Sequence, residues 1–321
     1  MGLLHNQFGI RHVISSAQFG REALACVFEG ADDIAEKFAQ GRRHEYAHAL
    51  DGAVVASYFF EPSTRTRWSF ESGTHRMGGS VITTENAEKF SSAVKGERLE
   101  DSVRVIGHYA DAIVMRHKRT GAAELAANYA KVPVINAGDG TGEHPTQAML
   151  DLYTIKKLRG TIDGVNIAIV GDLRLGRTVR SLAKGLCNYK KVTVHFVAPD
   201  ILQVSPDVVD YLALRRVKFQ KHSNINEVLA DMDCIYMTRT QRERMTAEED
   251  TATKNADTEY GIGTHNLHLM RPDQILMHPL PRNNEIEFSP LTDGRAKSVY
   301  LDDQIKAGLH VRAFLLKDLL N

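Results

Sequence analysis

The chain has 321 residues, of which 43% are hydrophobic and 25% are charged. This composition is ordinary for a globular protein and excludes a disordered or fibrous main body. At roughly 150 residues per domain, the length predicts two domains. The 40 Lys and Arg residues balance the 40 Asp and Glu residues. The net charge of zero excludes a general binder of nucleic acid or of a membrane surface, whose footprint is basic.

Cysteine usage and the N-terminus exclude further classes. Cys26, Cys187 and Cys234 lie far apart and form no Cys-x-x-Cys pair, so neither a disulfide framework nor a zinc ribbon is expected. Free thiols at this density predict a reducing compartment, the cytoplasm. Residues 1–7 lack the basic start and the apolar core of a signal peptide. No apolar run reaches the roughly 18 residues of a membrane span, so no membrane partner is expected.

Short apolar runs alternate with longer amphipathic stretches along the chain. The runs predict strands, in chain order, at 53–60, 112–115, 132–135, 165–170, 192–197, 234–237 and 275–277. The stretches predict helices at 64–77, 99–109, 122–129, 145–158, 177–187 and 225–230, and a last amphipathic helix at 304–320. Alternating strands and helices, with nearly continuous Val and Ile in the strands, predict parallel sheets covered on both faces. Two such sheets fit two α/β domains.

Two polar segments interrupt this alternation. Residues 136–151 combine a glycine-rich stretch at 137–142 with a helix that opens at Pro145, which suits a first helical turn. They predict a flexible hinge loop followed by a helix that links the two sheets. Residues 242–264 are charged and poor in apolar side chains, which predicts a long mobile loop. A functional lid and a disordered surface insertion both fit that loop.

The most distinctive motif, at 59–67, follows the first predicted strand and runs Phe-Phe-Glu-Pro-Ser-Thr-Arg-Thr-Arg. Ser63 or Thr64 would cap the helix that follows. A helix start offers unpaired N–H groups and the positive end of the helix dipole, which together bind an anion. Arg65 can grip a phosphate through two parallel hydrogen bonds. A plain helix cap with solvated Arg65 and Arg67 fits equally well, so the residues alone leave both interpretations open.

Five motifs in fixed order resemble the transcarbamylase family. Residues 63–67, flanked by Phe-x-Glu and Ser-Phe-Glu, look like its carbamoyl-phosphate signature. The other four are Lys95-Gly96-Glu97 after Ser91, Val114-Met115-Arg116-His117, His144-Pro145-Thr146-Gln147 and His278-Pro279-Leu280-Pro281-Arg282. The resemblance covers nearly the whole chain, and five ordered motifs are far more specific than any one of them.

Within the family, the chain resembles the aspartate branch more than the ornithine branch. Ornithine transcarbamylases typically carry His-Cys-Leu-Pro where this chain has His-Pro-Leu-Pro at 278–281, and the segments at 171–178 and 237–241 resemble aspartate carbamoyltransferases. Aspartate brings two carboxylates, for which Arg177, Arg239 and Arg244 are candidate cations. An ornithine pocket would instead need an acid for the side-chain ammonium.

The resemblance implies two Rossmann-like domains, each a parallel sheet flanked by helices, joined by a linking helix. Residues 1–143 would bind carbamoyl phosphate, with the C-terminal helix at 304–321 packing back on them, and residues 144–303 would bind aspartate. The implied enzyme is a one-carbon-group transferase that makes N-carbamoyl-L-aspartate and phosphate in pyrimidine biosynthesis, with no cofactor. The alternatives are a transcarbamylase for another amine, an inactive anion-binding scaffold and a nicotinamide-dependent oxidoreductase.

The resemblance also implies site roles. The catalytic residues would be Arg65, Thr66, Lys95, Arg116 and His144, with His144 donating as a neutral ring. Carbamoyl phosphate would be held by Ser63, Thr64, Arg65, Thr66, Ser91, Arg116, His144, Gln147 and the backbone carbonyls of Leu280 and Pro281. A cis bond fits the turn at Pro281. Aspartate would be held by Lys95, Arg177, Arg239 and Gln241.

In the family, the loop at 85–97 enters the active site of the neighbouring subunit. The resemblance therefore implies a homotrimer with shared active sites, with or without regulatory chains. On its own, Lys95 fits a solvated loop lysine just as well; its place before Gly-Glu in the family order favours a role in the site.

Two other patterns are expected to carry no separate chemistry. Residues 171–177 follow a strand and suggest a dinucleotide-binding turn, but the Gly-x-Gly-x-x-Gly spacing is absent, so we expect a turn that aims Arg177. His265 and His268, with His278 and Cys234 farther off, suggest a metal but lack a carboxylate at ligand spacing. We therefore expect solvent-facing histidines and no metal site.

The lone tryptophan and the cysteines have structural interpretations. We expect Trp68 to pack against a helix face rather than to stack on a ligand. The three cysteines are expected to lie in hydrophobic cores rather than to act as nucleophiles.

Overall fold

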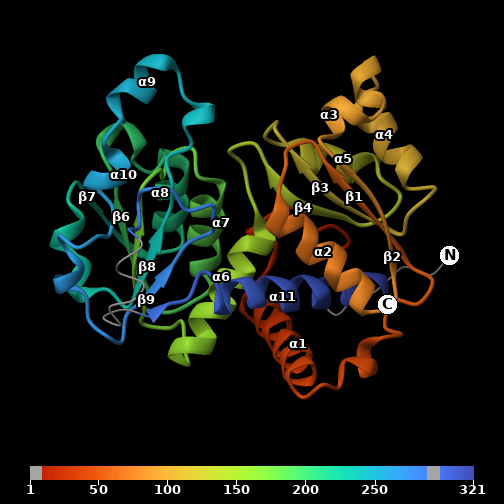
Figure 1. The fold of residues 1–321 in the computed structure, drawn as a ribbon, viewed down its shortest axis with the longest axis horizontal. Helices are drawn as coiled ribbons and strands as arrows, with labels where there is room; N and C mark the ends of the chain where they lie inside the picture. The colour runs from red at the N-terminus through yellow and green to blue at the C-terminus, as the bar shows by residue number, and fades with distance from the viewer. Residues whose placement is uncertain (1–8, 288–296) are drawn as a thin grey trace. The chain divides into compact units, whose positions relative to one another are not determined.

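The computed structural model describes residues 9–287 and 297–321 (Figure 1). The chain forms two compact units. Unit 1 comprises Met1–Leu150 and Ile305–Asn321, and unit 2 comprises Asp151–Gln304. Helices α6 (Pro145–Arg159) and α11 (Asp303–Leu320) each run across a boundary between the units, so the chain passes from one unit to the other twice within helices.

Unit 1 is built on a four-stranded parallel sheet in the order β2-β1-β3-β4. Its strands are β1 (Val54–Phe59), β2 (Ser80–Glu85), β3 (Ala112–His117) and β4 (Val134–Asp139). Its longer helices are α1 (Arg21–Ala39), α2 (Thr64–Arg76), α4 (Leu99–Ile106) and α5 (Ala122–Tyr129). One core of this unit packs β1, β3 and α5 together around Tyr58, Ile113, Met115 and Ala126.

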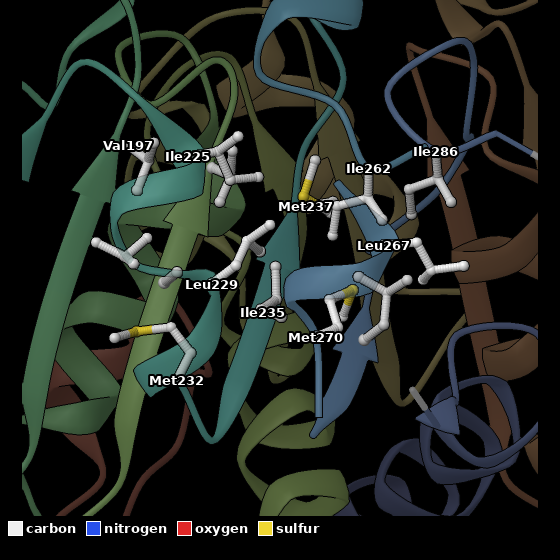
Figure 2. Packing of buried hydrophobic residues seen from close by; sticks show 14 of the residues in the cluster. Val197, Ile225, Leu229, Met232, Ile235, Met237, Ile262, Leu267, Met270 and Ile286 are labelled. Atoms are coloured by element: carbon white, nitrogen blue, oxygen red, sulfur yellow. The ribbon is translucent and has the colours of Figure 1, made fainter. Parts of the chain in front are cut away.

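Unit 2 is built on a six-stranded parallel sheet in the order β10-β9-β8-β5-β6-β7. Its strands are β5 (Asn166–Val170), β6 (Thr193–Val197), β7 (Lys218–His222), β8 (Cys234–Met237), β9 (Ile275–Met277) and β10 (Lys297–Ser298). Two helices, α7 (Arg177–Leu186) and α8 (Pro206–Leu214), follow β5 and β6. Figure 2 shows part of its core, where Ile235 and Met237 of β8 lie among Leu229, Leu267 and Ile286.

Short helical segments complete both units. They are η1 (Ser16–Gln18), η2 (Arg43–Tyr46), α3 (Ala87–Phe90), η3 (Ser92–Lys95), η4 (Asp200–Leu202), η5 (Ile225–Glu227), η6 (Leu229–Asp231), η7 (Arg242–Arg244), α9 (Ala247–Ala252), α10 (Ala256–Glu259) and η8 (Leu267–Leu269). Within residues 9–287 and 297–321, no helix is long and apolar enough to cross a membrane.

The predicted fold class is confirmed, and each predicted apolar strand forms. The helices at α1 and α8 and the strands β2 and β7 were not predicted. Strands β2 and β7 each form one edge of their sheet, where one side of the strand pairs with no other strand, and their side chains stay polar and largely exposed. Strand β10, at the other edge of the unit 2 sheet, has only two residues and was not predicted either. Their sequences therefore lack the apolar signal on which the other strands were found.

The predicted helix at 225–230 is wrong. Two separate 3₁₀ turns, η5 and η6, occupy this segment. They turn Ile225, Val228 and Leu229 into the unit 2 core. The spacing of these three apolar residues is also that of one face of an α-helix, but the segment is too short to sustain an α-helix.

The segments predicted as flexible loops are also more ordered than expected. Residues 242–264 contain η7, α9 and α10, and Arg242 ties them together by ion pairs to Asp250 (2.6 Å) and Asp257 (3.4 Å). The stretch at 85–97 likewise forms α3 and η3.

The glycine-rich stretch at 137–142 is not a loose hinge. The first half of this stretch belongs to β4, and Asp139 organises the turn that follows. The Asp139 carboxylate accepts hydrogen bonds from the backbone N–H of Gly121 (2.7 Å) and of Glu143 (2.9 Å) and from the side chain of Asn136 (3.1 Å).

A buried carboxylate joins three elements of unit 2. Asp151 on α6 accepts a hydrogen bond from the Tyr236 hydroxyl on β8 (2.7 Å) and another from the Gln304 amide at the start of α11 (2.6 Å). The carbonyl oxygen of the same amide accepts the backbone N–H of His278, 3.1 Å away. Burial, together with the neighbouring Asp151, raises the pKa of Tyr236 well above its usual range, so the hydroxyl keeps its proton and donates.

We predict that Tyr236→Phe lowers the free energy of unfolding by about 1–3 kcal/mol, because a buried carboxylate oxygen loses its donor. Urea unfolding followed by circular dichroism measures the change. Tyr109→Phe is the matched control, since Tyr109 is exposed on the surface. Equal stability of the two variants would show that the hydrogen bond to Asp151 contributes nothing.

Candidate active site

The sequence-predicted residues follow the carboxyl ends of neighbouring parallel strands. In unit 1, the chain leaves β1 toward Ser63, leaves β2 toward Ser91 and leaves β4 toward His144, while Arg116 lies at the end of β3. Because these strands are adjacent and parallel, their carboxyl ends lie at one edge of the sheet. This edge is where open α/β sheets bind ligands.

The phosphate-signature segment begins helix α2, as predicted. Ser63 is the N-cap residue, with extended backbone, and its hydroxyl makes no cap hydrogen bond. It instead accepts a hydrogen bond from the Arg116 guanidinium, 3.3 Å away. Thr64 is exposed and Arg65 is half-buried in the first turn. A helix start with two arginines nearby, one of them bonded to the N-cap hydroxyl, is an arrangement suited to a phosphate dianion.

Thr66 and His144 meet although 78 positions separate them in the chain. The Thr66 hydroxyl lies 3.3 Å from His144 Nε2, and both residues are buried. The backbone carbonyl of His144 accepts the N–H groups of Gln147 and Ala148, so the histidine stands at the start of α6, as predicted. Gln147 is buried in the first turn of the same helix.

Arg116 is held by a carboxylate that the sequence analysis did not single out. Glu61 lies 3.5 Å from Arg116, and both side chains are largely shielded from solvent. The backbone N–H of Phe60 also donates to the carbonyl oxygen of Arg116 (2.8 Å), which fixes the end of β1 beside the end of β3. The guanidinium is thus aimed at Ser63 from a defined position.

Ser91 and Lys95 lie beyond β2 in different environments. The Ser91 hydroxyl caps η3, donates to the Ala87 carbonyl oxygen (2.6 Å) and lies 3.3 Å from the Tyr58 hydroxyl. Lys95 ends η3 and is exposed. Ser91 is therefore tied to unit 1, whereas the ammonium group of Lys95 extends into solvent.

In unit 2, the turn after β5 requires glycine and presents Arg177. Gly171 has φ of +109°, and a Cβ there would lie 2.2 Å from the carbonyl oxygen of Thr238. This close approach brings the ends of β5 and β8 together. Arg177 begins α7 and is only 7% exposed, so its charged side chain is buried. The expectation that this turn presents Arg177 at a helix start is confirmed.

Asp172 links this turn to the segment after β8. Its buried carboxylate accepts the backbone N–H groups of Leu175 (2.9 Å) and Gln241 (3.0 Å). Burial raises the pKa of Asp172, while these two N–H donors act in the opposite direction. Asp172 thereby positions Gln241 relative to Arg177, a role that the sequence analysis missed.

Arg239 is engaged by an acidic neighbour. Its guanidinium forms a two-pronged ion pair with Glu243 and also donates to the Thr240 carbonyl oxygen (3.1 Å). The hydrogen bond from Arg239 lowers the pKa of Glu243, and the same bond raises the pKa of Arg239. Arg244, the other candidate cation, lies in η7 of the same segment.

The His-Pro-Leu-Pro segment follows β9 and contains the expected cis bond, between Leu280 and Pro281. The N–H of Leu280 donates to His278 Nδ1 (2.7 Å), so that nitrogen carries no proton and Nε2 donates to Glu285, 2.8 Å away. Burial alone would raise the pKa of Glu285, but the His278 hydrogen bond and its other contacts lower it overall. His278 therefore shapes the turn. The prediction that it faces solvent is wrong, because the side chain is buried.

Several other expectations are settled by burial. His265 and His268 are exposed, as predicted, and among the described residues no three His, Cys, Asp or Glu side chains gather as metal ligands. Trp68 is 59% exposed, so its predicted packing is wrong, because it projects from the side of α2 opposite buried Thr66 and Phe70.

The cysteines and Arg67 also differ in part from expectation. Cys234 is buried, which raises the pKa of its thiol, whereas Cys26 and Cys187 are only partly buried. Burial still raises the pKa of Cys187 to about 11, which disfavours a thiolate nucleophile. Arg67 is turned toward β2, with Glu85 at 3.1 Å and Thr83 at 3.2 Å, rather than toward Ser63.

Comparison with known proteins gives one family over nearly the whole chain. Residues 11–157 match the model of the aspartate/ornithine carbamoyltransferase carbamoyl-P binding domain, and residues 163–319 match the Asp/Orn binding domain of the same family. The chain is 47% identical over 314 residues to a chloroplastic aspartate carbamoyltransferase of Arabidopsis thaliana, covering 98% of this chain and 79% of that protein. It is 43% identical to an aspartate carbamoyltransferase catalytic subunit of Methanothrix thermoacetophila, covering 97% and 98%.

Solved structures give the same result. Aspartate transcarbamoylase of Trypanosoma cruzi, in complex with carbamoyl phosphate and aspartate, superposes with a TM-score of 0.89 at 36% identity and covers 97% of both chains.

The geometry predicts that α2 begins an anion site. Arg116→Gln should weaken binding of inorganic phosphate about ten- to a hundredfold, because it removes a charge-assisted hydrogen bond worth about 1.5–3 kcal/mol. Isothermal titration calorimetry measures the dissociation constant. Arg119→Gln is the control, since Arg119 is exposed three residues farther on. Unchanged phosphate affinity in Arg116→Gln would refute the site.

Proposed function

The chain belongs to the aspartate/ornithine carbamoyltransferase family, and we propose that it is an aspartate carbamoyltransferase. It transfers the carbamoyl group of carbamoyl phosphate to the amine of L-aspartate and is a transferase of one-carbon groups. The products are N-carbamoyl-L-aspartate and phosphate, which places the reaction in pyrimidine biosynthesis.

The observation that carries this proposal is the convergence at the start of α2. Arg116 reaches Ser63 there, and Thr66 meets the buried His144. The reaction needs a site that holds the phosphate dianion and donates hydrogen bonds to the carbonyl oxygen as it gains charge. Ser63, Thr64, Arg65 and Arg116 would hold the phosphate. Thr66, Arg116 and His144 would donate to the carbonyl oxygen, with Gln147 beside them.

The covalent step needs no enzyme nucleophile. The aspartate nitrogen forms a bond to the carbamoyl carbon, and the bond between that carbon and the phosphate oxygen breaks. The amine proton goes to the departing phosphate. What the protein supplies is alignment of the two substrates and stabilisation of charge.

The choice of aspartate rests on the cations of unit 2. Arg177 is buried at the start of α7, and Arg239 follows the neighbouring strand β8. Two guanidiniums suit the two carboxylates of aspartate, and the backbone N–H of Gln241 is fixed by Asp172. We assign carbamoyl-phosphate binding to residues 1–143 with the helix at 304–321, and aspartate binding to residues 144–303.

We further propose a homotrimer in which Ser91 and Lys95 serve the active site of a neighbouring subunit. Lys95 is exposed at the end of η3, so its ammonium group is free to reach a second chain. Any regulatory chains would bind to this trimer, which would already contain the complete active sites. The Methanothrix thermoacetophila relative is named as a catalytic subunit.

We propose the cytoplasm as the location, because all three cysteines are free thiols. The plant relatives are named as chloroplastic, so the test is the location of a tagged full-length protein in its own cell. Fluorescence confined to an organelle would overturn the cytoplasmic assignment.

The function predicts that the purified protein carbamoylates aspartate and no other amine. Carbamoyl phosphate is incubated with aspartate, ornithine and other amines, and carbamoylated product and phosphate are both measured. Product with another amine would identify a different transcarbamylase, and the absence of product with every amine would indicate an anion-binding scaffold.

Arg239→Ala should raise the KM for aspartate at least tenfold and change the KM for carbamoyl phosphate little. The reason is that aspartate loses the guanidinium that binds one of its carboxylates, whereas carbamoyl phosphate loses no contact.

Shared sites predict complementation between two inactive variants. Lys95→Ala and Arg65→Ala chains should each be inactive alone, and mixed trimers should recover part of the activity. In a mixed trimer, some sites combine the intact Arg65 of a Lys95→Ala chain with the intact Lys95 of a neighbouring Arg65→Ala chain. Differently tagged chains are mixed, purified as heterotrimers and assayed. Verified mixed trimers without activity would contradict shared sites.

A further inference from the structure

Arg312 is a buried cation of unit 1 that belongs to none of the motifs above. It lies on α11 and is only 3% exposed. Its guanidinium donates a hydrogen bond to the Ser69 hydroxyl on α2 (2.7 Å) and another to the Thr146 hydroxyl on α6 (3.3 Å). The guanidinium also lies 5.4 Å from the centre of the Phe70 ring. One side chain from the C-terminal helix thus joins the two helices whose starts form the phosphate site.

The packing around Arg312 leaves the guanidinium little freedom. Helix α11 approaches α2 so closely that a Cβ on Gly73 would lie 3.3 Å from the Ala313 backbone. A Cβ on Gly308 would lie 3.0 Å from the Arg312 guanidinium itself and 3.3 Å from Leu150. Figure 1 shows α11 running alongside α2 in this unit. The cation is therefore held at a fixed place beside both helices.

The two partner hydroxyls belong to residues that adjoin Thr66 and His144. The Ser69 hydroxyl donates in turn to the Thr66 carbonyl oxygen, 2.9 Å away. Thr146 is buried in the first turn of α6, two residues after His144. Arg312 therefore binds one residue that is bonded to the Thr66 backbone and another that lies two positions after His144.

The use of arginine here calls for a reason beyond packing. A buried charge costs free energy that an apolar side chain of similar volume would avoid. Arginine supplies several donors in a rigid fork, so a single side chain can fix two hydroxyls on two helices at once. Its positive charge lies in a low-dielectric interior, where it attracts an anion at the start of α2 more strongly than it would in water.

We propose that Arg312 is a positioning residue for the carbamoyl-phosphate site. It holds α2 and the first turn of α6 against each other through Ser69 and Thr146 and so places Thr66 and His144 for the substrate. The inference rests on the proposed function for its substrate, while its geometry concerns the binding of a phosphate dianion.

The test compares Arg312→Met with wild type in the full-length protein. The dissociation constant of inorganic phosphate is measured by calorimetry, the KM of each substrate by assay, and the fold by circular dichroism. We expect phosphate affinity and kcat/KM for carbamoyl phosphate to fall at least tenfold, and the KM for aspartate at saturating carbamoyl phosphate to stay within twofold. Lys306→Met, which removes an exposed cation of the same helix, should change none of these.

Hydroxyl variants separate positioning from general stability. Ser69→Ala and Thr146→Val should each weaken phosphate binding in the wild-type chain and add nothing further in the Arg312→Met chain, because the same linkage is already broken. Should Arg312→Met fail to fold, the Ser69→Ala, Thr146→Val double variant decides by the same criterion. A folded variant that binds phosphate within twofold of wild type would overturn the inference. Absence of aspartate carbamoylation in wild type would instead overturn the proposed function and leave the phosphate comparison standing.

Discussion

Parallel strand pairing is the constraint on which the candidate site depends. In unit 1, the register sets Phe59 of β1 opposite Arg116 of β3, so the segment that carries Ser63 leaves the sheet beside the arginine that contacts it. In unit 2, Val170 of β5 is opposite Met237 of β8, and Arg177 and Arg239 follow these two strand ends. Antiparallel pairing would have sent alternate segments to opposite edges. The cations gather because each crossover helix returns the chain to the same starting edge.

The charge balance of the whole chain is repeated within the site. Arg116 has Glu61 beside it, and Arg239 is paired with Glu243. These carboxylates hold flexible guanidiniums in one orientation before any ligand arrives, which reduces the ordering cost of binding. The zero net charge of the sequence therefore does not mean that cations are missing. At Arg116 and Arg239, a cation of the candidate site is balanced and oriented by an acid of the same unit.

How far the sequence predicts this protein depends on the kind of signal each feature leaves. The strands with buried, apolar side chains were predictable, including β4 at a sheet edge, whereas β2 and β7 are polar edge strands. Helix α1 has the buried spacing Leu24, Val27, Phe28 and Ala31, but glycine at its N-cap gives no start signal, so the helix was missed.

The site shows the same limit. The segments at 63–67 and 144–147 could be named from the sequence because they resemble family motifs. The contact between Thr66 and His144 could not, since it depends on how two helices pack. Asp172, Glu61 and Arg312 were missed because one acid or one arginine in a sequence carries no sign of what it will contact once it is buried.

The C-terminal helix shows why such contacts escape local patterns. A Cβ on Gly30 of α1 would overlap the Phe314 ring of α11, and Gly73 of α2 lies against Ala313 of the same helix. The last residues of the chain thus complete the core of the unit that the first 150 residues begin. Helix α11 also links α2 to α6, because Arg312 bonds to Ser69 and Thr146. The helix that begins the candidate phosphate site, α2, is in this way supported by a helix more than two hundred residues away in sequence.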